Sequence, residues 1–481
     1  MRIFFIALFI MAGSSSFSQV TVSHGTSQEF MLNNKNTNYL SYATSNSTYF
    51  IFRKTKFNVV FESYIALANQ AGQLSPIREL AFNNGVINNS FEINAMDVIN
   101  NELVVFVENR NKAEGKNFLS TRILDEKGYF TGAENPIASI PFLKMINPGK
   151  WFISVTPDKK HIAVVGKLPY EKGKPVQFQY YFLDNSFKQL SNGTFSDPSI
   201  VKDIYIEKFY ASDKGEFYLI GNEYDKTYQY PVLYKASINS PKVTIKSLKI
   251  EDPSLKNIGY KSTMNANNDL ILAGYTQIKK TLTIGNPVAG TWTYISSKPE
   301  VTIANFEKPV EDLVAVNILS NGSTFYVIGE QYKKERETPT SEQILAHEEN
   351  FNYFYGNILV SGFSEDGQKK FDIPVSRKWS SRNTFEDISF ASSIMNNKLS
   401  LVFNDQYIKY GETYDSYKQY KLPVAISITN DGLMEQPQAL IKEFDILNNS
   451  FKLYPFFFNA DNDRMVILSA DYRSIKPVIF K

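Results

Sequence analysis

The sequence predicts an all-β protein built as a ring of similar sheets, on three observations. The first is a degenerate repeat of about 55 residues, clearest where GEFYLIGNEY (residues 215–224) recurs as GSTFYVIGEQY (residues 322–332). The second is composition, because 29 tyrosines and 37 phenylalanines favour strands. The third is that each copy contains a strand that is apolar on both faces, as expected between two neighbouring sheets. Together they indicate a β-propeller of four-stranded antiparallel blades.

The number of copies predicts the number of blades. Eight turn-strand units can be aligned, and successive strands leave their units 53 to 75 residues apart, at Arg53, Glu108, Lys167, Asn222, Tyr275, Glu330, Asp405 and Asp471. We therefore expect eight blades, with seven as the alternative if one copy is irregular. The last copy supplies only three strands, whereas residues 20–32 precede the first copy. We expect this N-terminal strand to complete the last sheet and close the ring.

The chain is expected to form a single propeller domain, residues 19–481, behind a signal peptide, residues 1–18. Arg2 precedes the apolar run 3–13, and small residues precede a cleavage site near Gln19. A closed array of repeats can exceed the usual size of one core because each unit packs against its neighbours. We expect an exported protein, periplasmic or extracellular.

Composition argues against several classes of function. The chain has 51 basic and 49 acidic residues, so no charge bias indicates a nucleic-acid partner. The absence of cysteine removes disulfides, thiolate metal sites, cysteine nucleophiles and lipidation on cysteine. No GxSxG motif or phosphate-binding glycine loop occurs. No stretch of 18 unbroken apolar residues follows the leader, so we expect no transmembrane segment in the mature chain.

The longest spacing between copies predicts an insertion at residues 330–350. It contains TSEQILAHEE (residues 340–349), in which Thr340 and Gln343 match a capping box before a short helix. His347 and the two glutamates beside it lack the HExxH spacing of a zinc site. We therefore expect a solvated helical turn and no metal there.

Long, tyrosine-rich segments follow the second strands, and in a propeller such loops emerge on one face. Loops held on a rigid scaffold are a common place for function. Tyrosine offers a flat apolar ring and a hydroxyl, which suits sugars or partner side chains. Packing of the loops against one another is the alternative for these rings. The expected ligand-binding residues are Tyr224, Tyr228, Tyr275, Tyr407, Tyr410, Tyr414, Tyr417, Arg53 and Glu108.

Three carboxylates at consecutive strand exits, Glu330, Asp405 and Asp471, would form an acidic arc on this face. Carboxylates about 5 to 10 Å apart can cleave glycosides, and several oxygen ligands can hold calcium. Ordinary solvated strand ends are the alternative. If the protein is an enzyme, these three are its candidate catalytic residues. Otherwise we expect no catalytic residue, no resident metal and no cofactor, with calcium left open.

The run VTPDKKHIAVVG (residues 155–166) resembles the aspartate-turn-strand element of secreted bacterial β-propeller repeats. The resemblance recurs weakly along the mature chain and reaches only the superfamily. The WD dipeptide, the kelch double glycine and the sialidase aspartate box are absent, so no family's active site is implied. We expect a non-enzymatic binding or scaffold protein that recognises a glycan, a peptide or an envelope or secreted partner protein. The alternative is a polysaccharide hydrolase or lyase that uses the strand-exit carboxylates.

Overall fold

The structure is a computed structural model that describes residues 20–29, 37–56, 60–80, 91–125, 127, 129–142, 149–201, 203–225, 228–279, 286–338, 350–382, 389–406, 421–440, 452–460, 464–470 and 474–481. Several predictions from the sequence lie outside these residues. They are the signal peptide, the short helix within residues 340–349, and the sites at Tyr407, Tyr410, Tyr414, Tyr417 and Asp471.

The described elements are strands, and they form four-stranded antiparallel groups in chain order. Each group is called here a blade and is named by its first strand. The first four blades are β3 (Thr37–Ala43), β4 (Ser47–Lys56), β5 (Val60–Asn69) and β6 (Arg78–Glu79); β7 (Phe91–Ile99), β8 (Glu102–Asn111), β9 (Lys116–Leu124) and β10 (Phe130–Pro141); β11 (Lys150–Val155), β12 (His161–Lys167), β13 (Gln177–Asp184) and β14 (Gln189–Ser196); and β15 (Ile206–Ala211), β16 (Glu216–Asp225), β17 (Tyr228–Ser237) and β18 (Ser240–Ser247). A single parallel bridge between Ser196 and Lys242 joins the last two of these into one eight-stranded sheet.

Three further blades and a closing sheet follow in the same order. They are β19 (Leu255–Met264), β20 (Leu270–Ile278), β21 (Pro287–Ile295) and β22 (Thr302–Glu311); β23 (Leu313–Ser320), β24 (Thr324–Arg336), β25 (Phe351–Ser364) and β26 (Lys369–Val375), with β27 (Trp379–Arg382) added to β25; β28 (Phe390–Met395), β29 (Lys398–Gln406), β30 (Lys421–Ile428) and β31 (Gln438–Ala439); and β32 (Lys452–Ala460), β33 (Met465–Ala470) and β34 (Ser474–Phe480), with β1 (Val22–His24) and β2 (Gln28–Glu29).

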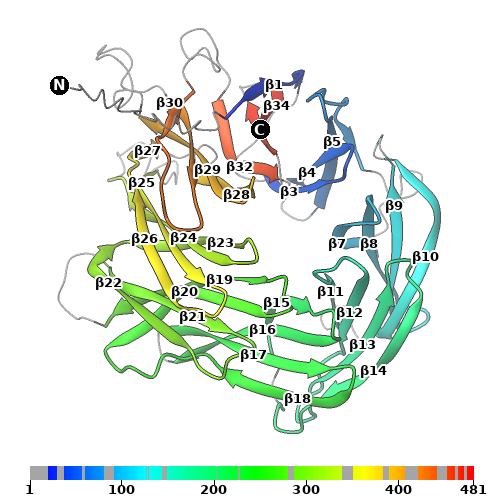
Figure 1. Ribbon diagram of the computed structural model, residues 1–481. Coiled ribbons are helices and arrows are strands. Elements are labelled where there is room, and N and C mark those ends of the chain that lie inside the picture. Colours follow the sequence, from blue (N-terminus) through cyan, green and yellow to red (C-terminus); the bar gives the residue numbers. More distant parts are fainter. Residues whose placement is uncertain are drawn as a thin grey trace, which may run out of the picture.

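The blades are set around a ring, with the first strand of each on the inside and the fourth on the outside (Figure 1). First strands of neighbouring blades touch, as at β11 with β15, β19 with β23 and β28 with β32. The contact of β3 with β32 joins the first blade to the closing sheet. This arrangement confirms an all-β propeller of four-stranded antiparallel blades.

The N-terminal strands complete the closing sheet, as the sequence predicts. Val22 pairs with Phe480 and His24 with Val478, antiparallel to the last strand. Gln28, in β2, pairs with Ile475 farther along the same strand. The N-terminal strands β1 and β2 therefore cover the edge that β34 would otherwise expose.

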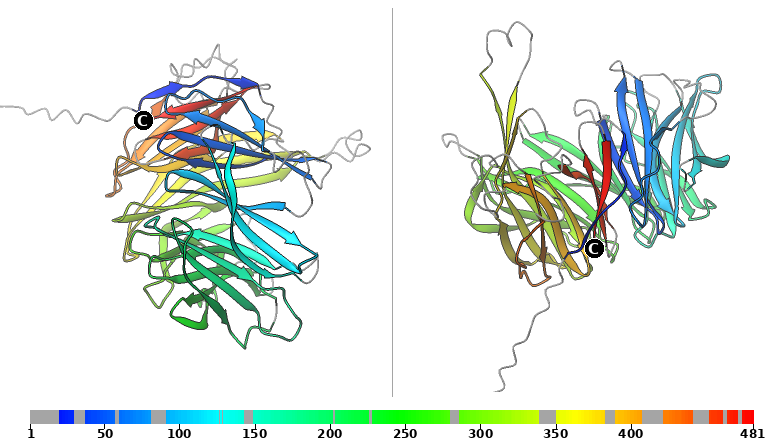
Figure 2. Two further views of the ribbon diagram at one scale, coloured as in Figure 1. Left: turned by 90° about the vertical axis from the view of Figure 1, so that its right-hand side faces the viewer. Right: turned by 90° about the horizontal axis from the view of Figure 1, so that it is seen from above.

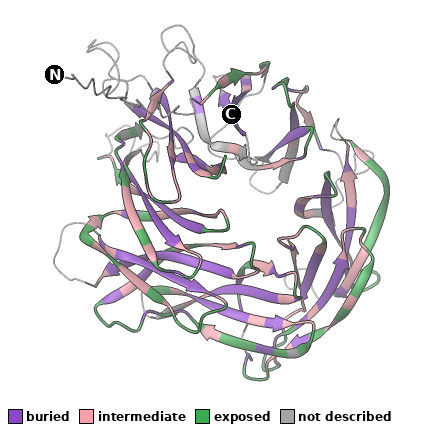
Figure 3. Ribbon diagram, in the orientation of Figure 1, coloured by how far each residue is buried: buried purple, intermediate pink, exposed green. Residues whose placement is uncertain are grey.

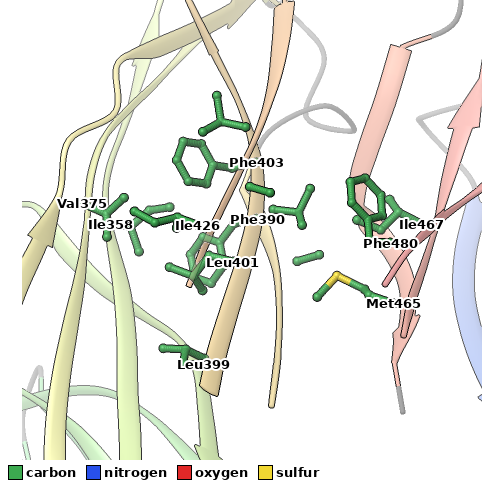
Figure 4. Close-up of a cluster of buried hydrophobic side chains, with 14 of the residues drawn as sticks. Ile358, Val375, Phe390, Leu399, Leu401, Phe403, Ile426, Met465, Ile467 and Phe480 are labelled. Carbon is green, nitrogen blue, oxygen red and sulfur yellow. The ribbon is translucent and has the colours of Figure 1, made fainter. Parts of the chain in front are cut away.

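The eight apolar strands expected from the repeat are the second strands β4, β8, β12, β16, β20, β24, β29 and β33. They are buried on both faces, as in β20, whereas outer strands such as β10 and β22 are largely exposed (Figure 3). Apolar side chains of adjacent sheets meet between these strands. Figure 4 shows the β28 blade packed between the β23 blade and the closing sheet through Ile358, Val375, Phe390, Leu401, Phe403, Ile426, Met465, Ile467 and Phe480.

The tight turn between β7 and β8 has the backbone of a two-residue hairpin. Asn100 and Asn101 both have positive φ, 50° and 64°, as a two-residue hairpin requires. Several turns also bond to the equivalent turn of the next blade. The Asp158 amide donates to Asp213 Oδ1 at 3.2 Å, and the Asp213 amide donates to Asn268 Oδ1 at 2.6 Å. Residues one repeat apart thus touch directly.

Glycines that precede the strand exits are required by close backbone approach. At Gly274 a Cβ atom would lie 2.1 Å from the carbonyl oxygen of Gly259. Gly259 is the extra residue of a bulge between Ile258 and Tyr260 in β19. The recurring glycine therefore makes room for the bulged first strand of the same blade.

Candidate functional site

The hairpin of β24 and β25 is the longest in the described chain and projects from the ring (Figure 2). Its pairing runs from Thr324 with Ser364 out to Arg336 with Phe351. The short strand β27 adds to the outer part of β25. The sequence suggested that an insertion begins at Glu330, but the strand continues past this residue to Arg336. Interstrand pairing therefore organises the start of that segment.

Tyrosine rings hold the outer hairpin together. Tyr332 lies opposite Tyr355 in the ladder, with ring centroids 5.2 Å apart, and 6.5 Å from the ring of Tyr353. Burial raises the pKa values of Tyr332 and Tyr355 above the ordinary value of tyrosine. Both phenols are therefore neutral hydrogen-bonding groups near pH 7 and not bases.

A pocket of about 600 Å³ opens beside this hairpin, between the β19 and β23 blades. The rings of Tyr332, Phe354 and Tyr355 contribute to its wall, and Phe354 is 39% exposed. Residues of both charges and several residues with amide or hydroxyl groups complete its lining: Glu311, Asp312, Gln331, Lys333, Asn357, Ser376, Arg377, Lys378 and Ser380. The pocket thus combines aromatic surface with hydrogen-bond donors and acceptors.

Hydrogen bonds fix the polar part of the pocket. Gln331 accepts from the Asn357 amide at 3.1 Å and donates to the Glu311 carbonyl at 3.2 Å. Asn357 Oδ1 in turn accepts from the Arg377 amide at 3.3 Å. The Tyr332 amide donates to the carbonyl of Asp312 at 2.9 Å. These bonds join β24, β25 and the turns around them, so the wall is preorganised.

A buried ion pair lies behind the pocket. Arg377 Nη1 is 2.9 Å from Glu330 Oε2, and the two side chains are 0% and 5% exposed. Arg377 Nε donates to the carbonyl of Asn404 at 3.0 Å, in the next blade. The neighbouring Lys378 amide donates to Asp405 Oδ1 at 3.2 Å. Burial raises the pKa of Glu330, and the positive charge of Arg377 opposes that rise.

The acidic arc expected from the sequence is therefore buried at the two carboxylates that the structure describes. Glu330 and Asp405 do approach a common point, but they are only 4% and 0% exposed. The reason is that β24 extends past Glu330 and that the segment carrying Arg377 covers both carboxylates. Sequence reasoning missed Arg377, since it lies between β26 and β27 and outside the repeated strand.

Two of the expected ligand-binding residues are also buried, which corrects their placement on the loop face. Tyr275 is 0% exposed and packs 6.2 Å from the ring of Phe306. Glu108 is 3% exposed, and its carboxylate accepts from Arg110 at 2.7 Å and from Asn117 at 3.1 Å. Both positions lie within long second strands, whose ends the sequence places too early.

The remaining described candidates lie within strands. Arg53 belongs to β4, between Asn38 and Ser63 in the ladder. Tyr224 in β16 pairs with Gln229, and Tyr228 begins β17. Much of the tyrosine-rich segment expected after this second strand therefore belongs to the strands β16 and β17.

Several strand-exit positions connect neighbouring blades. Lys167 Nζ donates to the carbonyl of Ile204 at 2.6 Å, ahead of β15. Asn222 accepts from the Tyr260 hydroxyl of β19 at 3.2 Å, and Asn404, which precedes the exit at Asp405, donates to the Leu453 carbonyl at 3.0 Å. Polar residues at or beside these strand exits thus form hydrogen bonds between neighbouring blades.

A second pocket, of about 370 Å³, lies between the β15 and β19 blades. The Tyr260 hydroxyl donates to Glu207 Oε2 at 2.9 Å at this junction. The pocket is lined by Glu207, Gln229, Pro231, Lys256, Asn257, Ile258, Gly259 and Tyr260. It repeats the combination of a tyrosine, amides and balanced charges.

No group of three or more His, Cys, Asp or Glu side chains among the described residues could hold a metal ion. No helix among those residues is long and apolar enough to cross a membrane.

No protein-family model matches the chain, and no curated protein matches its sequence. Solved structures with some likeness include the β-propeller domain of the Trilobed protease from Pyrococcus furiosus, at 8% identity and TM-score 0.35, covering 87% of this chain and 99% of that one. A polysaccharide lyase described as an ulvan lyase has 9% identity and TM-score 0.41, with 85% and 95% coverage. Prolyl oligopeptidase B from Galerina marginata has 11% identity and TM-score 0.40, and the match covers 91% of this chain but only 55% of that protein. These likenesses are too distant to indicate an activity. The ring of four-stranded sheets itself identifies the chain as a β-propeller protein.

Proposed function

We propose that this protein is an exported propeller that binds a glycan, without cleaving it, in the pocket beside the β24–β25 hairpin. One observation carries the proposal. The pocket places the partly exposed ring of Phe354 and the half-buried ring of Tyr332 among fixed amides and charged groups. An aromatic face packs against the apolar side of a sugar ring, while the surrounding donors and acceptors suit its hydroxyls.

The two described candidate catalytic carboxylates are poorly placed to cleave a ligand in this pocket. Neither Glu330 nor Asp405 lines the pocket, and Arg377 holds the carboxylate of Glu330 in an ion pair. Glycoside hydrolysis needs two carboxyl groups that flank the scissile bond.

The test is binding of the purified protein to di- and hexasaccharides of the cello-, laminari-, xylo-, chito- and galacturonate series, measured by calorimetry. Phe354→Ala is expected to weaken binding about two- to tenfold, because an aromatic contact contributes about 0.5–1.5 kcal/mol. Tyr129→Ala is the matched control, since Tyr129 is 60% exposed on another blade. Equal loss in both variants would contradict the proposed site. Appearance of shortened or unsaturated sugars in the same samples would replace binding with cleavage.

A further inference from the structure

The two pockets lie on either side of the same blade. The smaller pocket uses Lys256 and Tyr260 at the start of β19, together with Glu207 and Gln229 of the preceding blade. The larger pocket uses Glu311, the last residue of β22, together with residues of the following blade. The β19 blade therefore separates two cavities at consecutive blade junctions.

Both cavities open on the same face of the ring. In an antiparallel four-stranded sheet, the start of the first strand and the end of the fourth strand lie at one edge. Lys256 is the second residue of β19, and Glu311 is the last residue of β22. First strands β19 and β23 also touch. A ligand that follows this edge of the β19 blade passes from one pocket to the other.

The smaller pocket has polar and aromatic groups of its own that can contact a ligand. Gln229 is exposed and Tyr260 is half-buried, with its hydroxyl anchored on Glu207 at 2.9 Å. Gly259 has a φ of +50°, and a Cβ built there would meet no atom within 4 Å. A ligand can therefore approach the backbone at Gly259 closely.

We infer that the two pockets are subsites for one extended oligosaccharide that lies along the edge of the β19 blade. The inference rests on the proposed function and adds the length and path of the ligand. Charges are mixed in both pockets, with Glu207 and Lys256 in the lining of one and Asp312 and Lys333 in the lining of the other. A hydroxyl-rich chain can use such mixed donors and acceptors along its whole length, whereas a strongly charged peptide would meet groups of its own sign.

The test compares a disaccharide with a hexasaccharide of whichever series binds in the calorimetric panel. The hexasaccharide is expected to bind about tenfold more tightly, with one molecule per protein, because the second contact is made intramolecularly. The double variant Gln229→Ala, Lys256→Ala should reduce the ratio of the two affinities to about one. Gln189→Ala, an exposed glutamine on outer strand β14, is the matched control and should leave the ratio unchanged.

The other outcomes of these experiments would overturn the extended path, the assignment to sugar or the proposed function itself. Equal affinities for both lengths, or a double variant that keeps the ratio, would overturn the extended path while the pocket at Phe354 could still be the binding site. Binding of six-residue peptides with the same dependence on Gln229 and Lys256 would overturn the assignment to sugar. Failure of every saccharide to bind a protein with a normal melting transition would overturn both the path and the proposed function.

Discussion

At the scale of single residues, Arg377 organises the region behind the larger pocket. Its guanidinium reaches Glu330 in its own blade and the Asn404 carbonyl in the next. The backbone beside it donates to Asp405. One basic side chain thus compensates buried acidic groups that the repeat places on two different blades. Removal of one partner from such a cluster leaves an uncompensated buried charge.

Replacement of Arg377 by methionine is therefore expected to destabilise the fold by about 3–5 kcal/mol. The measurement is urea unfolding followed by tryptophan fluorescence. Lys378→Met, at the exposed neighbouring residue, should change the free energy of unfolding by less than about 0.5 kcal/mol. Combining Arg377→Met with Glu330→Gln should recover part of the loss, and no recovery would argue against the pair.

Asp158 in the turn before β12 gives a prediction on pH. Burial alone would raise its pKa, but hydrogen bonds from the Lys160 amide and the Thr156 hydroxyl hold the pKa below its usual value. A lowered folded-state pKa means that this stabilisation is complete above the unfolded value of about 3.9 and is lost as the pH falls through the folded value.

Asp158→Asn should therefore flatten the loss of stability below about pH 4, measured as melting temperature against pH. The variant cannot gain a proton at this position, so its stability changes less on acidification. Asp431→Asn, at an exposed turn residue, should leave the acid slope as in the parent protein. If the melting temperature of Asp158→Asn fell with pH as steeply as that of the parent protein, other carboxylates would control the loss of stability in acid.

At the scale of elements, the glycines before the strand exits show how one residue sets the shape of a blade. Gly274 faces the carbonyl of Gly259, where the bulge brings β19 close. Gly329 likewise faces the carbonyl of Val314, with 2.7 Å to a Cβ built there. The recurrence of this glycine in the sequence is thus explained by a bulge that recurs in the first strands β19 and β23.

Gly274→Ala is expected to destabilise the protein by at least about 1–3 kcal/mol, because backbone atoms have to move apart. Gly356→Ala in β25 is the comparison, since the nearest neighbours of a Cβ built there are side-chain atoms of Gln331 and not backbone atoms. It should cost clearly less in the same denaturant titration. Equal costs would mean that the bulged strand β19 adapts as easily as a side chain.

At the scale of the whole molecule, the N-terminal strands close the ring. Thr21 and Lys481 exchange two backbone hydrogen bonds of 3.0 Å, and β1 and β2 both pair with β34. The first blade also packs against the closing sheet through Phe50 and Phe52 on one side and Leu468 on the other. Closure therefore ties together segments that are far apart in the chain.

Deletion of residues 19–29 should lower the melting temperature and promote association, because it exposes the edge of β34. Calorimetry and size-exclusion chromatography are the measurements. A triple substitution of Gln28, Glu29 and Thr26 by alanine, which keeps β1 in place, should be milder. If the deletion left both melting temperature and size unchanged, closure by these strands would be dispensable.

The sequence by itself determined the repeated turn-strand units and the closure by the N-terminal strand. It could do so because periodicity, turn chemistry and unpaired strand edges are local or regular properties of a chain. It placed strand ends too early, at Glu330 and Tyr275, because polar residues and tyrosines also continue a strand when a neighbouring blade covers them. Only the tertiary structure decided that Arg377 meets Glu330, 47 residues away, and that pockets form at blade junctions. These depend on how curved, bulged sheets meet, and no local pattern in the sequence records that.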